Sequence, residues 1–205
     1  MNIDFSYVSK HYAARTHEKM KEVLMDQNAS GPAVFYYMIR GGKDQRNITV
    51  WEPGVVGGEY IKTYGHYHVG HLDETYWILY GTGVVLMQEL AKDDKGQMVS
   101  DKVVNFKAVP VKAGDSVFIK SGLGHLAVNV GKTYFVTADD SPVDFSEKKD
   151  EASMPGHADY KKVQAMQGFA FYLIEKDGKP AFVKNKNYKE VKSYDLAGIP
   201  LLGNP

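Results

Sequence analysis

Apolar and β-branched residues occur in short runs that are separated by polar turns along most of the chain. Gly, Asp and Pro form the separating stretches, such as P53-G-V-V-G-G58 and K112-A-G-D115. Runs of this length with turn residues between them are typical of antiparallel strands. We therefore predict strands over residues 33–40, 47–52, 59–63, 75–90, 103–111, 116–119, 126–130 and 133–138. Two more runs, 168–175 and 180–184, flank K176-D-G-K179 and predict a closing hairpin.

The N-terminal region differs from the rest, because its apolar residues follow a helical spacing. Ala13, Met20, Val23 and Leu24 mark one face of the segment 11–25, which predicts a helix there. We accordingly divide the chain into a helical extension (1–32), a barrel domain with its hairpin (33–185) and a C-terminal tail (186–205). The polar stretch 141–155 is expected to be a loop, and the tail from residue 194 onward is expected to pack loosely.

Many short antiparallel strands with little helix indicate an all-β fold class, either a jelly roll or a barrel. A barrel of this size can hold one small ligand inside. The pattern alone is also compatible with another kind of β-sandwich.

Composition narrows the classes of function. The chain has 205 residues with 25 basic and 25 acidic ones, and no basic block is longer than a Lys-Lys pair, so nucleic acid is not an expected partner. No window approaches 18 apolar residues, and the first residues lack a signal-peptide pattern, so we expect a soluble cytoplasmic protein without membrane contact. Cysteine is absent, so any metal site would rest on histidine, carboxylates and water.

Three histidines and two acidic residues fall between positions 66 and 74, just before an aromatic run. His66 and His68 are two residues apart, which on a strand places both imidazoles on one face. Glu74 follows a short turn, and a hairpin would fold it back onto them; two histidines and one carboxylate leave metal positions open. His125 follows a glycine-rich turn and is the best candidate for a fourth ligand. An HxH pair alone is a weak signal, because histidines are common in surface turns, and we assign His71 to such a turn.

The spacing of these residues resembles the two sequence motifs of the cupin superfamily. The first, G-x5-H-x-H-x3–6-E-x6-G, has Tyr60 in place of the leading glycine and otherwise matches at His66, His68, Glu74 and Gly81. The second, G-x5-P-x-G-x2-H-x3-N, has Lys120 in place of the proline and otherwise matches at Gly114, Gly122, His125 and Asn129. The resemblance covers residues 33–140 and implies a cupin double-stranded β-helix with His66, His68, Glu74 and His125 around one divalent metal.

The flanking sequence is similar to the cupin-type glucose-6-phosphate isomerase family. The matching stretches are P53-G-V-V-G57, T63-Y-G-H-Y-H68, E74-T-Y76, G81-T-G83, G156-H-A-D-Y160 and Q167-G-F-A-F-Y-L-I-E-K-D-G178. This resemblance implies a substrate phosphate held by Thr49, Thr63 and Gly65. It also implies that His157 and Tyr160 close over the phosphate and that Tyr76 acts beside the sugar. The chain departs from the family in three places. The turn before Glu74 is one residue shorter, which leaves Asp73 as a rival ligand; Gly122 stands where members have a tyrosine; and one extra residue lies between His157 and Tyr160.

The resemblance implies a metal-dependent interconversion of glucose 6-phosphate and fructose 6-phosphate. Glu74, the only carboxylate of the motif, is the expected proton carrier between C1 and C2 through an enediol, with a hydride shift as the rival mechanism. A cupin dioxygenase or other oxidoreductase, and a non-catalytic cupin that binds sugar phosphates, are the alternatives. A dioxygenase acting on an apolar substrate would not need the phosphate residues. Another phosphorylated sugar, such as mannose 6-phosphate, is also compatible, since nothing in the sequence reads the configuration at C2.

Neither the metal nor the oligomeric state follows from the residues. Three histidines and one glutamate suit Fe, Mn, Ni, Co or Zn. Cupin barrels often pair through their N-terminal strands, so the resemblance leads us to expect a homodimer in which strand 33–40 takes part.

Overall fold

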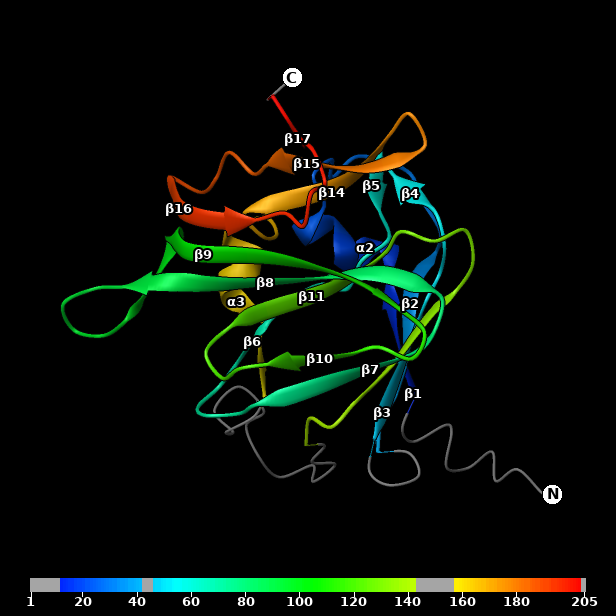
Figure 1. Ribbon diagram of the computed structural model, residues 1–205, viewed down its shortest axis with the longest axis horizontal. Helices are drawn as coiled ribbons and strands as arrows, with labels where there is room; N and C mark the ends of the chain where they lie inside the picture. Colours follow the sequence, from blue (N-terminus) through cyan, green and yellow to red (C-terminus); the bar gives the residue numbers. More distant parts are fainter. Residues whose placement is uncertain (1–11, 42–45, 143–156, 204–205) are drawn as a thin grey trace.

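The computed structural model describes residues 12–41, 46–142 and 157–203. Strands dominate these ranges, and helical structure is confined to short segments (Figure 1), which confirms the all-β prediction. The helical segments are α2 (His17–Met20), the 3-10 helix η1 (Lys21–Val23) and α3 (Lys161–Ala165). None of the helices in the described ranges is long and apolar enough to cross a membrane.

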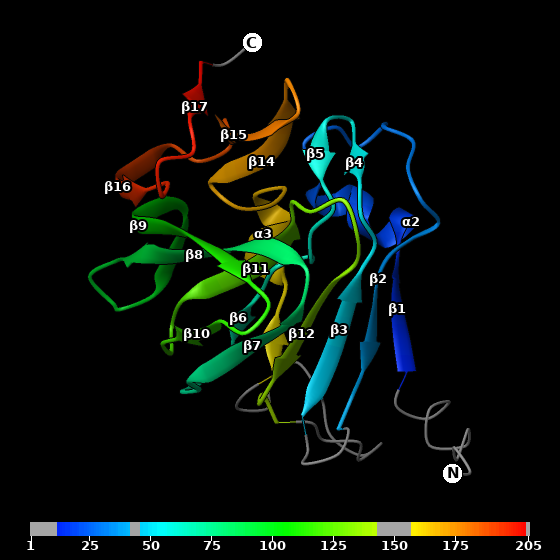
Figure 2. The ribbon, with the colours of Figure 1, turned by 45° about the vertical axis from the view of Figure 1, so that its right-hand side comes forward.

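The largest sheet has six strands and is antiparallel throughout, in the order β1-β2-β3-β12-β7-β10. Its strands are β1 (Tyr12–Thr16), β2 (Val34–Ile39), β3 (Asn47–Trp51), β12 (Phe135–Asp139), β7 (Glu74–Tyr80) and β10 (Ser116–Ile119). A second sheet, in the order β11-β8-β9-β16, lies beside it (Figure 2). Its strands are β11 (Gly124–Asn129), β8 (Thr82–Lys92), β9 (Met98–Lys112) and β16 (Glu190–Asp195).

Gly81 is the point where the chain passes from the first sheet to the second. The sequence predicts one strand over 75–90, whereas the structure has two, β7 and β8, with Gly81 between them. Gly81 has φ +81°, and a Cβ there would lie 2.4 Å from the carbonyl oxygen of Tyr134. Only glycine fits both the left-handed conformation and the close approach.

Two smaller sheets complete the fold. One has five strands, β17 (Leu201–Leu202), β15 (Lys179–Lys184), β14 (Phe171–Lys176), β5 (Glu59–Tyr60) and β4 (Val55–Val56), in that order. It contains the predicted hairpin, in which Lys176 pairs with Lys179 across the turn. The other joins β13 (Ala158–Asp159) to β6 (Tyr67–His68) and so places the segment from 157 onward against the strand that carries His68.

The predicted helix over 11–25 is wrong for its first half. Residue 11 lies outside the described ranges, and Tyr12–Thr16 is strand β1, paired with β2 at the edge of the six-stranded sheet. The side chain of Thr16 accepts the N–H of Lys19, so the helix begins only at His17. The available sheet edge outweighs the weak helical spacing, because hydrogen bonds to β2 satisfy the backbone of this segment.

The prediction of a loosely packed end is confirmed only in part, because residues 194–203 are mostly exposed but are anchored by strand pairing. Strand β16 pairs in parallel with β9, β17 pairs in parallel with β15, and Leu196 between them is buried. Most of the polar stretch 141–155 lies outside the described residues. The division of the chain into three segments at 32/33 and 185/186 stays a prediction.

The inward face of the six-stranded sheet changes character along the strands. Towards one end it carries core residues such as Trp51 and Phe135, whose ring centroids are 5.1 Å apart. Towards the other end the same face presents polar side chains, among them Thr49, Glu74 and Asp139, all of them buried. Period-two alternation places these polar groups together inside the molecule, where a ligand site can form.

Candidate metal centre and substrate cavity

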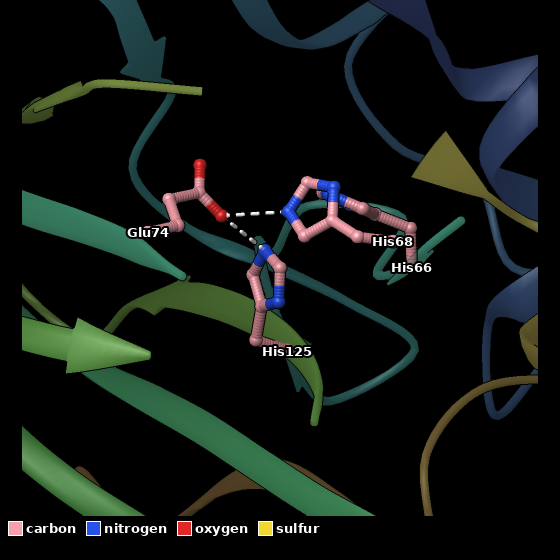
Figure 3. A group of neighbouring side chains, drawn as sticks. All are labelled: His66, His68, Glu74 and His125. Carbon is pink, nitrogen blue, oxygen red and sulfur yellow. Dashed lines mark hydrogen bonds and ion pairs between the residues drawn. The ribbon is translucent and has the colours of Figure 1, made fainter. Parts of the chain in front are cut away.

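The histidines of the two motifs come together through one backbone pairing. His68 lies on β6, His66 lies just before it, and an isolated antiparallel bridge joins His66 to His125 at the start of β11. The chain thus brings His125 to the other two histidines, although their positions in the sequence are far apart (Figure 3).

Glu74 reaches the histidines from the neighbouring sheet. It is the first residue of β7 and pairs with Ile119 of β10. The turn before it is tied to the loop that leads to His125, because Asp73 Oδ1 accepts the N–H of Ser121 at 2.8 Å. Asp73 is exposed and is not part of the histidine cluster, so the structure brings Glu74, and not Asp73, to the histidines.

The four side chains converge on one point. One ligand atom from each of His66, His68, Glu74 and His125 lies within 4.8 Å of the others. Glu74 Oε2 lies 3.0 Å from His68 Nε2 and 2.9 Å from His125 Nε2, whereas its second oxygen makes neither contact (Figure 3). His71 is exposed and is not part of the cluster.

The electrostatics favour the protonation states in which these groups bind metal. Burial opposes the ionisation of Glu74, but the contacts with His125 and His68 outweigh it and hold the pKa of Glu74 well below 4.5. Burial, with the neighbouring rings of His125 and His68, holds the pKa of His66 well below 6.5. An ionised carboxylate and a neutral imidazole are the forms that ligate a metal ion.

His125 supplies the clearest structural sign that the cluster fits a metal ion. Its side chain is fully buried, and neither ring nitrogen has a hydrogen-bond partner among the described residues. The 2.9 Å contact of Nε2 with Glu74 is an ion-pair distance without hydrogen-bond geometry. Leaving a buried imidazole nitrogen unsatisfied is costly, and a divalent cation at the meeting point would satisfy it. A donor set of three imidazoles and one carboxylate is suited to first-row transition metals.

A cavity of about 630 Å³ opens beside this cluster. Its wall includes His66, His68 and Glu74, while His125 is not among the lining residues. All six remaining residues that the sequence singles out also line it: Thr49, Thr63, Gly65, Tyr76, His157 and Tyr160. The structure therefore brings every predicted site residue to one place, although their separate roles stay predictions.

Thr63 and Gly65 lie on the chain just before the metal-site histidines. Thr63 Oγ1 accepts the N–H of Ala127 at 3.1 Å, so its own hydroxyl proton is left to donate. Gly65 has φ +82°, and a Cβ there would lie 3.0 Å from a ring carbon of Phe169 and 3.2 Å from a methyl of Leu126. Glycine is therefore required at this point of the cavity wall.

The segment from His157 onward packs against strand β6, which carries His68. Val69 N–H donates to the carbonyl oxygen of His157 at 2.8 Å, and the ring of Tyr160 lies 5.6 Å from that of His66. The ring of Tyr76 stands edge-on to that of His125, with the ring centroids 5.6 Å apart. Burial first, and then the negative charge of Glu74, hold the pKa of Tyr76 well above 10, so its hydroxyl stays protonated.

Ten lining residues escaped the sequence interpretation, among them Tyr36, Arg40, Asp139 and Lys161. Tyr36 and Arg40 fall on alternate positions of the predicted strand 33–40, so the period-two pattern was a usable signal for them. Asp139 is one residue beyond a predicted strand, and its carboxylate accepts hydrogen bonds from Asn47 at 2.7 Å and Ser141 at 2.6 Å. Burial, followed by the charge of Glu74, raises the pKa of Asp139.

Comparisons with known proteins identify the family of the chain. A family model described as "Glucose-6-phosphate isomerase (GPI)" matches residues 37–191. The glucose-6-phosphate isomerase of Thermococcus onnurineus is 31% identical over 142 residues, which are 69% of this chain and 62% of that protein. The enzyme of the same name from Pyrococcus furiosus is 31% identical over 144 residues, 69% of this chain and 63% of that protein. These alignments thus span less than two thirds of either relative.

Longer and more distant similarities also exist. The glucose-6-phosphate isomerase of Thermococcus litoralis is 28% identical over 191 residues, 86% of this chain and 87% of that protein. Among solved structures, a predicted oxalate decarboxylase from Thermotoga maritima is 20% identical with a TM-score of 0.38, over 68% of this chain and 96% of that one.

Proposed function

Because the chain belongs to the glucose-6-phosphate isomerase family, we propose that it interconverts glucose 6-phosphate and fructose 6-phosphate with the help of a divalent metal ion. The single observation that carries the proposal is the cluster of His66, His68, Glu74 and His125 at the wall of a cavity that also presents hydroxyl donors. Fe, Mn, Ni, Co and Zn are all compatible with this donor set.

The cavity suits a small anionic sugar. Its volume of about 630 Å³ lies in the range of small-molecule sites. Thr49 and Thr63 offer hydroxyls at the wall, and a phosphate group accepts hydrogen bonds on each of its oxygens. Arg40 and Lys161 line the same cavity and supply positive groups that a phosphate could pair with, while the carboxylates of the wall belong to Glu74, Asp139 and Asp159. An apolar substrate, which a dioxygenase of this fold would take, has no use for such a wall.

Glu74 is the group we assign to proton transfer. It is ionised at neutral pH, and the carboxylate is the form that can accept a proton from carbon C1 or C2 of the sugar. One of its oxygens contacts the two histidines, and the other makes neither contact and can face the substrate. A carboxylate anchored in this way can take the proton from one carbon and return it to the next.

The remaining groups bind and orient. A metal ion bound by the four ligands would act as a Lewis acid towards the oxygens on C1 and C2. Tyr76 is protonated and lies beside the metal-binding side chains, so it can donate a hydrogen bond to a sugar oxygen. His157 and Tyr160 would close the phosphate end of the cavity. In the rival hydride shift the hydrogen passes directly between C1 and C2 of the sugar. Glu74 would then carry no proton, and no hydrogen from solvent would enter the sugar.

One assay tests the proposal directly. The protein, loaded in turn with each candidate metal, is incubated with fructose 6-phosphate, and glucose 6-phosphate is measured through a coupled dehydrogenase before and after EDTA. We expect EDTA-sensitive turnover that Glu74→Gln abolishes and that His71→Ala, in the exposed turn nearby, leaves unchanged. Absence of turnover with every metal would refute the isomerase proposal. Ligand binding without turnover would favour a non-catalytic sugar-phosphate-binding cupin. Solvent deuterium incorporated at C1 or C2 would distinguish the enediol path from the hydride shift.

Two further expectations remain predictions: the cytoplasmic location and the homodimer. Strand β2, which covers most of residues 33–40, is paired with β1 on one side and β3 on the other. A dimer that uses this strand would therefore contact its outward face, because neither edge is free to pair.

A further inference from the structure

We propose that Arg15 is a positioning residue of the substrate cavity. Arg15 orients the hydroxyl of Tyr36 so that this hydroxyl donates a hydrogen bond to the phosphate oxygens of the bound sugar. The identity of the ligand in this inference rests on the proposed function. The geometry rests on contacts at the N-terminal strand, a part of the chain that lies outside both sequence motifs.

Arg15 is held in place by the sheet and by three tyrosine rings. In the antiparallel pairing of β1 with β2, Arg15 is the direct cross-strand partner of Tyr36. Its guanidinium carbon lies 5.9 Å from the ring centroid of Tyr36, 5.6 Å from that of Tyr64 and 5.3 Å from that of Tyr160. Cation–π contacts of this kind hold a guanidinium in one orientation.

The guanidinium donates to two hydroxyl groups of the cavity wall. Its Nε donates to the Tyr36 hydroxyl oxygen at 3.1 Å, and a terminal nitrogen donates to the Tyr160 hydroxyl oxygen at 3.5 Å. Both tyrosines line the cavity. Arg15 is not among the lining residues, so it acts on the ligand only through them.

The Tyr36 hydroxyl is left with a single role by these contacts. Besides the bond from Arg15, its oxygen accepts the backbone N–H of Tyr64 at 3.3 Å. A phenolic hydroxyl has one proton to donate and two lone pairs to accept with, and both lone pairs are now occupied. Within the described residues no group accepts the proton. The residue is only 3% exposed and lines the cavity, so an acceptor for this proton must come from the cavity.

The acceptor that fits is an anionic oxygen. Burial first, opposed by the nearby charge of Arg15, raises the pKa of Tyr36, so the hydroxyl keeps its proton at neutral pH. The positive charge of Arg15 next to the Tyr36 hydroxyl makes this hydroxyl a stronger hydrogen-bond donor. Thr63, whose oxygen accepts the N–H of Ala127, lines the same cavity as a second donor. Two hydroxyls held as donors suit a group with several acceptor oxygens, as a phosphate has.

The role requires arginine rather than any cation. The planar fork of a guanidinium can donate to two hydroxyls at once while it lies against aromatic rings. A lysine ammonium at the same place is a compact, strongly hydrated charge, and it would hold the Tyr36 hydroxyl less firmly. Arg15→Lys is therefore expected to retain only part of the ligand affinity that Arg15 provides. If the position needed only a positive charge, Arg15→Lys would retain all of it.

Direct binding tests the proposal without reliance on turnover. Inorganic phosphate and fructose 6-phosphate are titrated calorimetrically into the wild type, Tyr36→Phe, Arg15→Met and the double variant. Tyr37→Phe is the matched control, because Tyr37 follows Tyr36 on the same strand and does not line the cavity. We expect Tyr36→Phe and Arg15→Met each to weaken both ligands by about tenfold, the value of one hydrogen bond to a charged group. Tyr37→Phe should change neither, and melting temperatures confirm that each variant folds.

The double variant decides whether Arg15 acts through Tyr36. In the Tyr36→Phe background, Arg15→Met should weaken binding by much less than tenfold, since the hydroxyl it orients is gone. Wild-type affinity in Tyr36→Phe would overturn the proposal, as would an equal effect of Arg15→Met in both backgrounds. Loss of phosphate affinity in a protein that shows no isomerase turnover would support the inference while the proposed function fails. In an active enzyme the variants should raise KM and leave kcat nearly unchanged.

Discussion

His66 and His125 are direct antiparallel partners through their backbones. The N–H of His66 donates to the carbonyl oxygen of His125 at 3.2 Å, and the N–H of His125 donates back to His66 at 3.0 Å. Their rings stand 4.4 Å apart. The ligands are therefore held together by the strands that carry them, so little ordering of the chain is left for metal binding to accomplish.

The first prediction concerns metal content. His125→Ala should lower metal affinity by at least about 100-fold, because loss of an outer partner of a ligand already costs roughly 10- to 100-fold. The measurement is the metal-to-protein ratio after dialysis against a weak chelator. His71→Ala, which alters an exposed histidine that is not part of the cluster, should keep a full complement of metal. Stoichiometric metal in His125→Ala would place the site elsewhere.

The second prediction concerns the close approach at Gly65. Gly65→Ala must adopt φ +82° and also place its Cβ 3.0 Å from the ring of Phe169. The left-handed conformation costs about 1–2 kcal/mol and the overpacking about 1–3 kcal/mol. Gly58→Ala is the matched control, because Gly58 has φ +85° and open space around it. In urea unfolding, Gly65→Ala should therefore lose clearly more free energy of unfolding than Gly58→Ala, and equal losses would contradict the packing argument.

The third prediction is a pH dependence of the metal-free protein. The pKa of His66 lies well below 6.5 in the fold, while the unfolded chain takes up this proton near pH 6.5. Between these two pKa values the unfolded state binds more protons than the folded state. The stability that the fold gains from keeping His66 neutral is therefore complete above about pH 6.5 and is lost as the pH falls. Melting temperatures from about pH 7.5 down to about pH 5 should show a steeper decline for the wild type than for His66→Gln. His71→Gln should keep the wild-type slope; a slope unchanged by His66→Gln would contradict the assignment.

The fourth prediction concerns the attachment of the helical segment to the barrel. The ammonium of Lys62 is paired with the buried carboxylate of Glu59 and donates to the carbonyl oxygen of Val23 at 2.7 Å. Glu59 in turn accepts the N–H of Met25 at 2.9 Å. Lys62→Met leaves this carboxylate buried without its cation, which should lower the free energy of unfolding by about 3–5 kcal/mol.

Two variants test whether the cost of Lys62→Met comes from burial of the unpaired carboxylate. Adding Glu59→Gln should recover part of the lost stability, because the uncompensated charge is then gone. Lys189→Met breaks the surface pair with Asp101, whose lysine side chain is 79% exposed, and should cost at most about 1 kcal/mol. Similar losses for both lysines in chemical denaturation would show that the buried pair contributes no more than the surface one.

The elements were predictable where local spacing decides them. The strand Ser116–Ile119 has the predicted bounds, and the hairpin at K176-D-G-K179 forms where its turn residues indicate. Tyr12–Thr16 was missed because a free sheet edge, which no local pattern reveals, outweighs a weak helical spacing. No local pattern reveals the anchoring of the tail either, since its strands pair in parallel with β9 and β15.

The sequence by itself indicated the four side chains that meet at the candidate metal centre, because His66, His68 and Glu74 lie close together in the chain and the resemblance of the second motif added His125. Only the tertiary structure decided what surrounds them. Tyr36, Asp139 and Arg15 come from separate strands, and whether their side chains face the cavity depends on the register of the sheet. Register sends each side chain to one face or the other, and it is set by pairing across the whole molecule rather than by neighbours in the chain.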